Sequence, residues 1–264
     1  MKNKIRQFAL SMGLTQFGVS LPEAGKAALV FLFPYYAGDF PGVISAYARG
    51  ADYHKVVRSY LEKICRFIEN ETGLDFSGNI FCDISPYSDR EIAYMAGLGF
   101  YGKNHMLINP TLGSYFFIGY IITEGLKLTS DTPLETGCAG CGKCIAACPG
   151  GALTDNFYAE KCASNISQKK GELTQEEENI LLKSGFIWGC DKCQSVCPHN
   201  SSLSLTPIPE FRDNLIYDLR QEDLEPLSER QFRKKYCNKA FTWRGKKPLL
   251  RNIILLNNSK HTGR

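Results

Sequence analysis

The sequence predicts a mixed α/β (α+β) fold with a cysteine-rich module in its middle. Two stretches rich in β-branched and aromatic residues, Ala27 to Tyr35 and Tyr115 to Thr123, predict buried strands. Tyr53 to Glu69 lies between them with apolar residues at helical spacing, which predicts an amphipathic helix. Strands separated by helices indicate an α/β domain. We therefore expect an α/β domain over residues 1–130, the cysteine module over 131–205, and a helical, basic segment over 206–264.

Shorter elements follow from local signals. Asp89 to Met95 is expected to be helical. Thr174 and Glu177 form a capping box that begins a helix running to about Lys183, and Gly185 ends it. After these, two short helices are predicted near the C-terminus, Leu224 to Lys235 and Pro248 to Asn257.

The spacing of the cysteines is the most specific signal in the chain. A C-x2-C-x2-C-x3-C-P run is followed by a second run that repeats its latter half, and the two comprise Cys138, Cys141, Cys144 and Cys148, then Cys190, Cys193 and Cys197. Thiolates at these spacings wrap an iron–sulfur cubane, and the cysteine before proline ligates the other cluster. The sequence therefore predicts a bacterial module with two [4Fe-4S] clusters.

Each cluster can be assigned four ligands, because Cys162 supplies the one that the second run lacks. The first set is Cys138, Cys141, Cys144 and Cys197, and the second is Cys148, Cys162, Cys190 and Cys193. Zinc is the main alternative, since C-x2-C pairs also build zinc sites. The two Cys-Pro endings argue against zinc, and the lack of a secretory leader argues against disulfides.

Composition points to a globular protein without a membrane anchor. The longest apolar stretches, such as Ala27 to Phe33 and Tyr115 to Ile122, are too short to span a bilayer. The first residues, Met1 to Gly18, show neither a signal-peptide core nor a twin-arginine pair. We therefore expect a cytoplasmic protein, a monomer, with no membrane partner.

Positive charge is concentrated at the C-terminal end, although the net charge of the chain is only +4. Between Arg230 and Arg264 there are eleven Lys or Arg residues and no Asp or Glu. Such a segment is typical of a surface that meets phosphate, and a solvated tail without a ligand is the alternative. Tyr236, Phe241 and Trp243 interleave with the cations, which favours a packed surface or one that faces nucleic acid.

Two short motifs match known binding patterns only in part. Gly97, Gly99 and Gly102 spell G-x-G-x-x-G, but the stretch that follows contains an Asn-Pro turn instead of the helix that a dinucleotide site needs. Asp52 and His54 begin the D-x-H-x-x-G pattern of a histidine that ligates cobalt, yet the glycine of that pattern is absent. His54 is therefore expected to be a surface or interface residue.

Asp83 can be interpreted in two ways. It ends a strand-like run and precedes a helix, so Asp83 or Ser85 can cap that helix. A carboxylate at the end of a strand beside apolar neighbours can also have a raised pKa and serve as an acid.

Several segments together resemble the epoxyqueuosine reductases, cobalamin- and iron–sulfur-dependent enzymes that complete queuosine in tRNA. Besides the cysteine runs, the matching segments are Ile44 to Lys55, Asp83 to Pro86, Ala96 to Asn104, Gly113 to Gly119, and Leu250 to Ile253. The resemblance covers most of the chain from Ala27 to Asn257 and rests on the order and spacing of these segments.

The resemblance implies a nitroreductase-like cobalamin-binding domain, over which the ferredoxin module closes. Asp83 falls where the family places its proton donor, and an Asp held protonated in an apolar site is expected there. Cobalamin contacts are implied at Tyr47, Arg49, Tyr53, His54, Asp83, Gly99, Lys103, Asn104, Ser114, Ser164 and Asn165. A reduced ferredoxin or flavodoxin-type donor is the implied source of electrons, and tRNA is the implied partner of residues 230–264.

The chain departs from the family in having a short N-terminus and no C-terminal helical-repeat region, so a short form is expected. The stretch after Cys162 also differs, which affects the contacts of Ser164 and Asn165. Two other functions remain open on the sequence alone. One is reductive dehalogenation of a small molecule, although its usual twin-arginine leader is absent, and the other is electron transfer by a ferredoxin-type protein without cobalamin.

Overall fold

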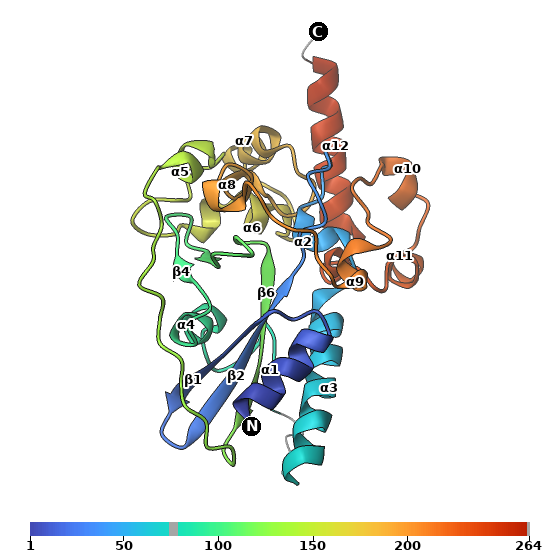
Figure 1. Ribbon diagram of the computed structural model, residues 1–264. Coiled ribbons are helices and arrows are strands. Elements are labelled where there is room, and N and C mark those ends of the chain that lie inside the picture. The colour runs from blue at the N-terminus through green and yellow to red at the C-terminus, as the bar shows by residue number, and fades with distance from the viewer. Residues whose placement is uncertain (74–78, 263–264) are drawn as a thin grey trace.

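The computed structural model describes residues 1–73 and 79–262, with side chains as far as residue 259. An antiparallel sheet forms the centre of the N-terminal part (Figure 1). Its strands lie in the order β1 (Gln16–Glu23), β2 (Lys26–Pro34), β6 (Phe116–Thr123) and β3 (Ile80–Phe81). The predicted strands are confirmed as β2 and β6, because each buries nearly its whole apolar run.

Helices cover both faces of this sheet. On one face, α1 (Lys2–Ser11) and α3 (Tyr53–Thr72) pack on the sheet through a common apolar core. On the other face lies α4 (Asp89–Met95). The helices predicted in the α3 and α4 regions are confirmed, and α3 is three residues longer than expected at its C-terminal end, where Gly73 adopts a left-handed conformation.

The glycine-rich motif forms a hairpin. Its strand β4 (Phe100–Tyr101) pairs antiparallel with β5 (Leu107–Ile108), which follows the motif. A Cβ atom on Gly99 would lie 2.7 Å from the carbonyl oxygen of Ile108, so glycine is needed for the close approach of the two chains. No helix follows the motif, and a Rossmann-type dinucleotide site is therefore not formed here.

The cysteine-rich part is built from short helices joined by turns. In chain order they are α5 (Lys143–Ala147), η1 (Ala159–Lys161), α6 (Ala163–Ser167), α7 (Gln175–Ser184), α8 (Lys192–Ser195) and η2 (Pro198–Asn200). The predicted capping box of α7 is confirmed: Thr174 and Glu177 bond to each other's backbone, and Gly185 ends the helix at φ +74°.

The C-terminal part packs against the rest of the molecule. Its elements are α9 (Pro209–Arg212), α10 (Gln221–Leu224), α11 (Glu229–Lys235), η3 (Ala240–Thr242) and α12 (Lys246–Thr262). The single helix predicted from Leu224 to Lys235 is wrong. Pro226 follows the end of α10, and a new capping box at Ser228 begins α11.

Two apolar contacts join this part to earlier segments. Phe211 lies in the core beneath the sheet. Phe232 and Phe241 share a second core with Ile44, near α2 (Ala46–Arg49), and with Trp188. Within residues 1–73 and 79–262, no helix is both long enough and apolar enough to cross a membrane.

Candidate active site

The structure brings the first predicted set of cysteines together. Cys138, Cys141, Cys144 and Cys197 line one small cavity, with Lys103 and Asn104 also on its wall. Cys144 is supplied by α5, and Cys197 directly precedes Pro198 at the start of η2. Cys141 is exposed, so this cavity lies close to the molecular surface.

The second predicted set lines a larger cavity. Cys148, Cys162, Cys190 and Cys193 lie on its wall. Burial, followed by the charges of Cys190, Cys162 and Cys148, raises the pKa of the Cys193 thiol to about 12.

The arrangement of the cysteines bears on the two alternatives. All eleven cysteines carry free thiols, so disulfides are not formed. In the described part of the chain, no three His, Cys, Asp or Glu side chains converge as one metal ion would require.

The cavity of the second cysteine set adjoins another of about 430 Å³, which Asp83 lines. The two cavities share lining residues, namely Tyr47, Arg90, Met106, Phe116 and Phe117. We call the combined space the central hollow. It has the Asp83 loop at one end and the second cysteine set at the other.

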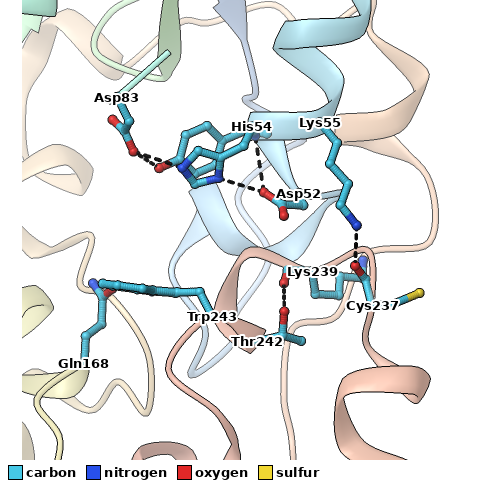
Figure 2. A network of polar contacts seen from close by, with 10 residues as sticks. Asp52, His54, Lys55, Asp83, Gln168, Cys237, Lys239, Thr242 and Trp243 are labelled. Atoms are coloured by element: carbon cyan, nitrogen blue, oxygen red, sulfur yellow. Dashed lines mark hydrogen bonds and ion pairs between the residues drawn. The ribbon is translucent and has the colours of Figure 1, made fainter. Parts of the chain in front are cut away.

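Asp83 belongs to a row of three polar side chains (Figure 2). It accepts hydrogen bonds from the hydroxyl of Tyr53 and, at 3.3 Å, from Nε2 of His54. The other ring nitrogen of His54, Nδ1, lies 2.9 Å from a carboxylate oxygen of Asp52. Asp52 also caps α3 by accepting from the backbone N–H of His54.

The charges in this row correct the expectation for Asp83. Hydrogen bonds from His54 and Tyr53 hold the pKa of Asp83 below its usual value, and its side chain is 53% exposed, so it is not in an apolar site. The bonds to Asp52 and Asp83 raise the pKa of His54 to about 9. At neutral pH the proton therefore sits on His54, between two carboxylates. Both ring nitrogens of His54 are bonded to carboxylates in this way.

The backbone at Asp83 shows that this residue does not cap the following helix. Ser88 caps α4 by accepting from the N–H of Glu91. Asp83 has φ +66°, an uncommon conformation for a residue other than glycine, and its N–H donates to Asp89 at 2.8 Å. The same Asp89 carboxylate accepts from Tyr120 at 3.1 Å. Burial raises the pKa of Asp89, a residue that sequence reasoning missed.

Some of the remaining predicted residues line the central hollow. Tyr47, Tyr53, Ser114 and Ser164 do so, as does Asn104. The side chain of Asn104 is buried, its Oδ1 accepts from the N–H of Met106, and its Nδ2 has no partner in the described part of the chain. An amide nitrogen left unpaired at a cavity wall is suited to a polar group of a ligand.

Four predicted residues lie elsewhere. Arg49 is buried and donates to the carbonyl oxygens of Ile44 and Phe40, at 2.7 and 2.9 Å, so it supports the chain fold. Gly99 serves the hairpin. Lys103 lies at the first cysteine set. Asn165 donates to the carbonyl oxygen of Ala159 at 3.1 Å.

Sequence reasoning also missed Arg90, which lines both parts of the central hollow. Its position one residue after Asp89, on the helix that follows Asp83, was the available signal. The fold and site thus define a class of protein: one with two cysteine sets suited to iron–sulfur clusters, the second of which faces an Asp–His pair across a hollow.

Comparisons with known proteins agree with this class. Residues 137–200 match the family described as 4Fe-4S double cluster binding domain, and residues 20–84 match epoxyqueuosine reductase QueG, DUF1730. The chain is 37% identical to an epoxyqueuosine reductase of Bacillus cereus over 223 residues, which are 83% of this chain and 57% of that protein. The chain spans less than two thirds of the length of such curated relatives.

Two solved structures are similar over nearly the whole chain. One is an epoxyqueuosine reductase with a tRNA-Tyr epoxyqueuosine-modified tRNA stem loop, with a TM-score of 0.79 and 27% identity over 97% of this chain and 80% of that one. The other, from Bacillus subtilis, has its catalytic Asp loop swung out of the active site, with a TM-score of 0.78 and 27% identity over the same shares. In sequence and in fold the chain is therefore similar to the epoxyqueuosine reductases, which are oxidoreductases.

Proposed function

We propose that this chain is a cobalamin- and iron–sulfur-dependent reductase that converts epoxyqueuosine to queuosine in tRNA. The observation that carries the proposal is the central hollow, which has the Asp83–His54 pair at one end and Cys148, Cys162 and their partners at the other. Removing an epoxide oxygen as water consumes two electrons and two protons. One end of the hollow is suited to deliver electrons and the other to deliver protons.

The cysteine sets are proposed to hold one [4Fe-4S] cluster each, as assigned from their spacing. The exposed Cys141 belongs to the set nearer the surface, so electrons from a reduced ferredoxin or flavodoxin-type donor are proposed to enter there. The set around Cys193 lines the central hollow, so a cluster held there would be placed to supply electrons to it.

Cobalamin fits the residues of the central hollow. Phe117, Met106 and Leu153 give it apolar walls, and the unpaired amide of Asn104 can meet a polar substituent. Tyr47 and Ser164 complete the proposed contacts. When bound, cobalamin would supply a strongly reducing cobalt centre.

The proton is proposed to pass through Asp83. His54 is protonated at neutral pH, since its pKa is raised to about 9, and it is bonded to Asp83 at 3.3 Å. Asp83 faces the hollow and can hand a proton from His54 to the departing oxygen, while Asp52 stabilises the imidazolium. Asp83 is the catalytic residue in this scheme, and His54 supplies it. The catalytic Asp loop of the Bacillus subtilis relative supports this assignment.

The proposed partner is tRNA, as for the relative solved with a tRNA stem loop. Several cations of the basic segment are already engaged: Lys246 donates to carbonyl oxygens of residues 224, 225 and 227, and Arg251 donates to Lys169 and Gly171. Arg230, Lys234, Lys235 and Lys247 are exposed, and these are the cations proposed to meet RNA phosphate.

The proposal is tested by anaerobic reconstitution with iron, sulfide and cobalamin, followed by an assay on epoxyqueuosine-containing tRNA. Formation of queuosine by the wild type but not by Asp83→Asn supports it. A protein that binds cobalamin but leaves the tRNA unchanged and reduces a halogenated substrate is a dehalogenase-type enzyme. A protein that binds clusters without cobalamin is an electron carrier.

A further inference from the structure

Trp243 is an exposed tryptophan held in a fixed position. Its side chain is 54% exposed, whereas Trp188, the other tryptophan, is fully buried. The indole Nε1–H donates to Oε1 of Gln168 at 3.1 Å. The guanidinium carbon of Arg244 lies 3.6 Å from the ring centroid. The hydrogen bond and the stacked cation fix the ring and leave it 54% exposed, so Arg244 covers one face and the rest of the indole is held in a preorganised orientation.

This tryptophan is joined to the central hollow by one residue. Nε2 of Gln168 donates to the hydroxyl of Tyr47 at 3.3 Å, and Tyr47 lines both parts of the hollow. Figure 2 shows the indole edge-on, extending toward Gln168, below Asp83 and His54 in that view. We call Gln168, Trp243 and Arg244 the aromatic rim.

Exposed cations lie close in sequence to the residues of the aromatic rim. Nε of Arg244 is buried without a hydrogen-bond partner in the described residues, and no ion pair of Arg244 occurs there either. Lys247 and Lys170 are exposed. The acidic neighbour, Glu229, accepts from the backbone N–H of Lys246 and from Arg233, which satisfies it within the fold. A rigid aromatic face among free cations is the arrangement that binds an unpaired RNA base together with its phosphate.

We propose that Trp243 is a stacking platform for an unpaired base of the RNA substrate, adjacent to the nucleotide whose modified base enters the central hollow, with Arg244 bonding the neighbouring phosphate. The inference rests on the proposed function and deepens it by assigning a residue to RNA recognition. The RNA must present its loop with bases turned outward, because a base within a stacked helix offers no free face to the indole.

The test measures equilibrium binding of an epoxyqueuosine-containing anticodon stem–loop to the holoenzyme. Trp243→Ala should raise Kd about 5- to 150-fold, the usual range for removal of one base stack. Trp243→Phe should keep most of the affinity. Phe40→Ala is the matched control, because Phe40 is equally exposed at 55% and lines a different cavity, and its Kd should equal that of the wild type.

Salt dependence and cofactor content separate the roles. Trp243→Ala should leave the slope of log Kd against log salt unchanged, whereas Arg244→Gln should reduce it by roughly 0.7 to 0.9. Cobalamin and iron content should stay at the wild-type level in both. An unchanged Kd in a stably folded Trp243→Ala protein overturns the inference. A decrease in bound cobalamin overturns it too, because the indole would then contact the planar base of cobalamin and not a base of the RNA.

Failure of this inference can be told apart from failure of the proposed function. If the wild type forms queuosine and Trp243→Ala binds the stem–loop normally, the function stands and the platform does not. If the wild type binds the stem–loop through Trp243 but does not reduce it, the platform stands and the reaction is a different one.

Discussion

At the scale of single residues, the site depends on where one proton resides. His54 lies between Asp52 and Asp83, and these two carboxylates stabilise the charged imidazole. The same bonds keep Asp83 ionised. The proton is therefore held on the imidazole of His54 and is proposed to reach the hollow through the carboxylate of Asp83. Neither residue is expected to support turnover alone.

Replacing Asp83 by asparagine tests its role as the last proton carrier. The amide keeps the hydrogen-bonding shape but cannot carry a carboxylic proton, so turnover should fall about 10² to 10⁴-fold while cluster and cobalamin content are retained. Thermal stability should change little, because Ser88 and not Asp83 caps α4. Steady-state kinetics and a thermal melt measure both effects. Near-normal turnover by a stable Asp83→Asn protein would leave the acid unidentified.

The raised pKa of His54 predicts a pH dependence. The protonated form is the active one, so kcat/KM should fall as pH rises through about 9, and His54→Gln should lack that limb. Stability follows the same sign: an imidazole with an unfolded pKa of about 6.5 contributes fully below that pH, and its contribution is lost as pH rises through about 9. A pH series of rates and melting temperatures for both proteins measures this. A basic limb that persists in His54→Gln contradicts the assignment.

At the scale of elements, the loop between β3 and α4 holds Asp83 in place through Asp89. Asp89 accepts from the N–H of Asp83 and from Tyr120, which ties a residue of positive φ to the helix and the sheet. Asp89→Ala should release the loop, speed hydrogen exchange at the Asp83 amide and lower turnover. Asp89→Asn keeps an acceptor oxygen and serves as the control. Equal amide exchange in wild type and Asp89→Ala would show that the loop is fixed by other contacts.

Some cations of the C-terminal helices are engaged within the fold, and others are exposed and proposed to bind tRNA. Neutralising Arg230, Lys234 and Lys247 together should weaken tRNA binding and reduce the salt slope by roughly 0.7 to 0.9 for each phosphate that is no longer bound. Lys246→Gln should instead lower the melting temperature, because its ammonium meets carbonyl oxygens at the end of α10. Binding measured over a salt series, with a melt for each variant, separates the two groups. An unchanged slope in the triple variant would make this surface a solvated one.

At the scale of the whole molecule, the two cysteine sets should act as separate units. Anaerobic analysis should find about eight irons per chain. Cys162→Ser should lose one cluster and keep the other, whereas Cys65→Ser should keep both, because Cys65 lies on α3 within the core beneath the sheet. About four irons in the wild type, or zinc in their place, would contradict the assignment of two clusters.

Much of the fold could be predicted because it depends on local patterns. The continuous apolar runs of β2 and β6 allow only buried strands, and α3 is defined by its apolar stripe. The capping box at Thr174 specifies where α7 begins. The break between α10 and α11 also has a local signal in the sequence, Pro226, because a proline disfavours a continuous helix.

The sequence by itself determined which residues are proposed to carry the chemistry, because cysteine spacing and the Asp83 segment are local. Only the tertiary structure decided how they are arranged. The pKa of His54 is raised and that of Asp83 is lowered by a contact between residues that are far apart in the chain. Arg49 lies away from the central hollow because it is buried and bonded to backbone carbonyl oxygens. The position of Trp243 beside Gln168 likewise depends on packing of the C-terminal part against the cysteine module. Contacts between residues far apart in the chain, and the pKa shifts that they cause, cannot be inferred from the spacing of residues along the sequence.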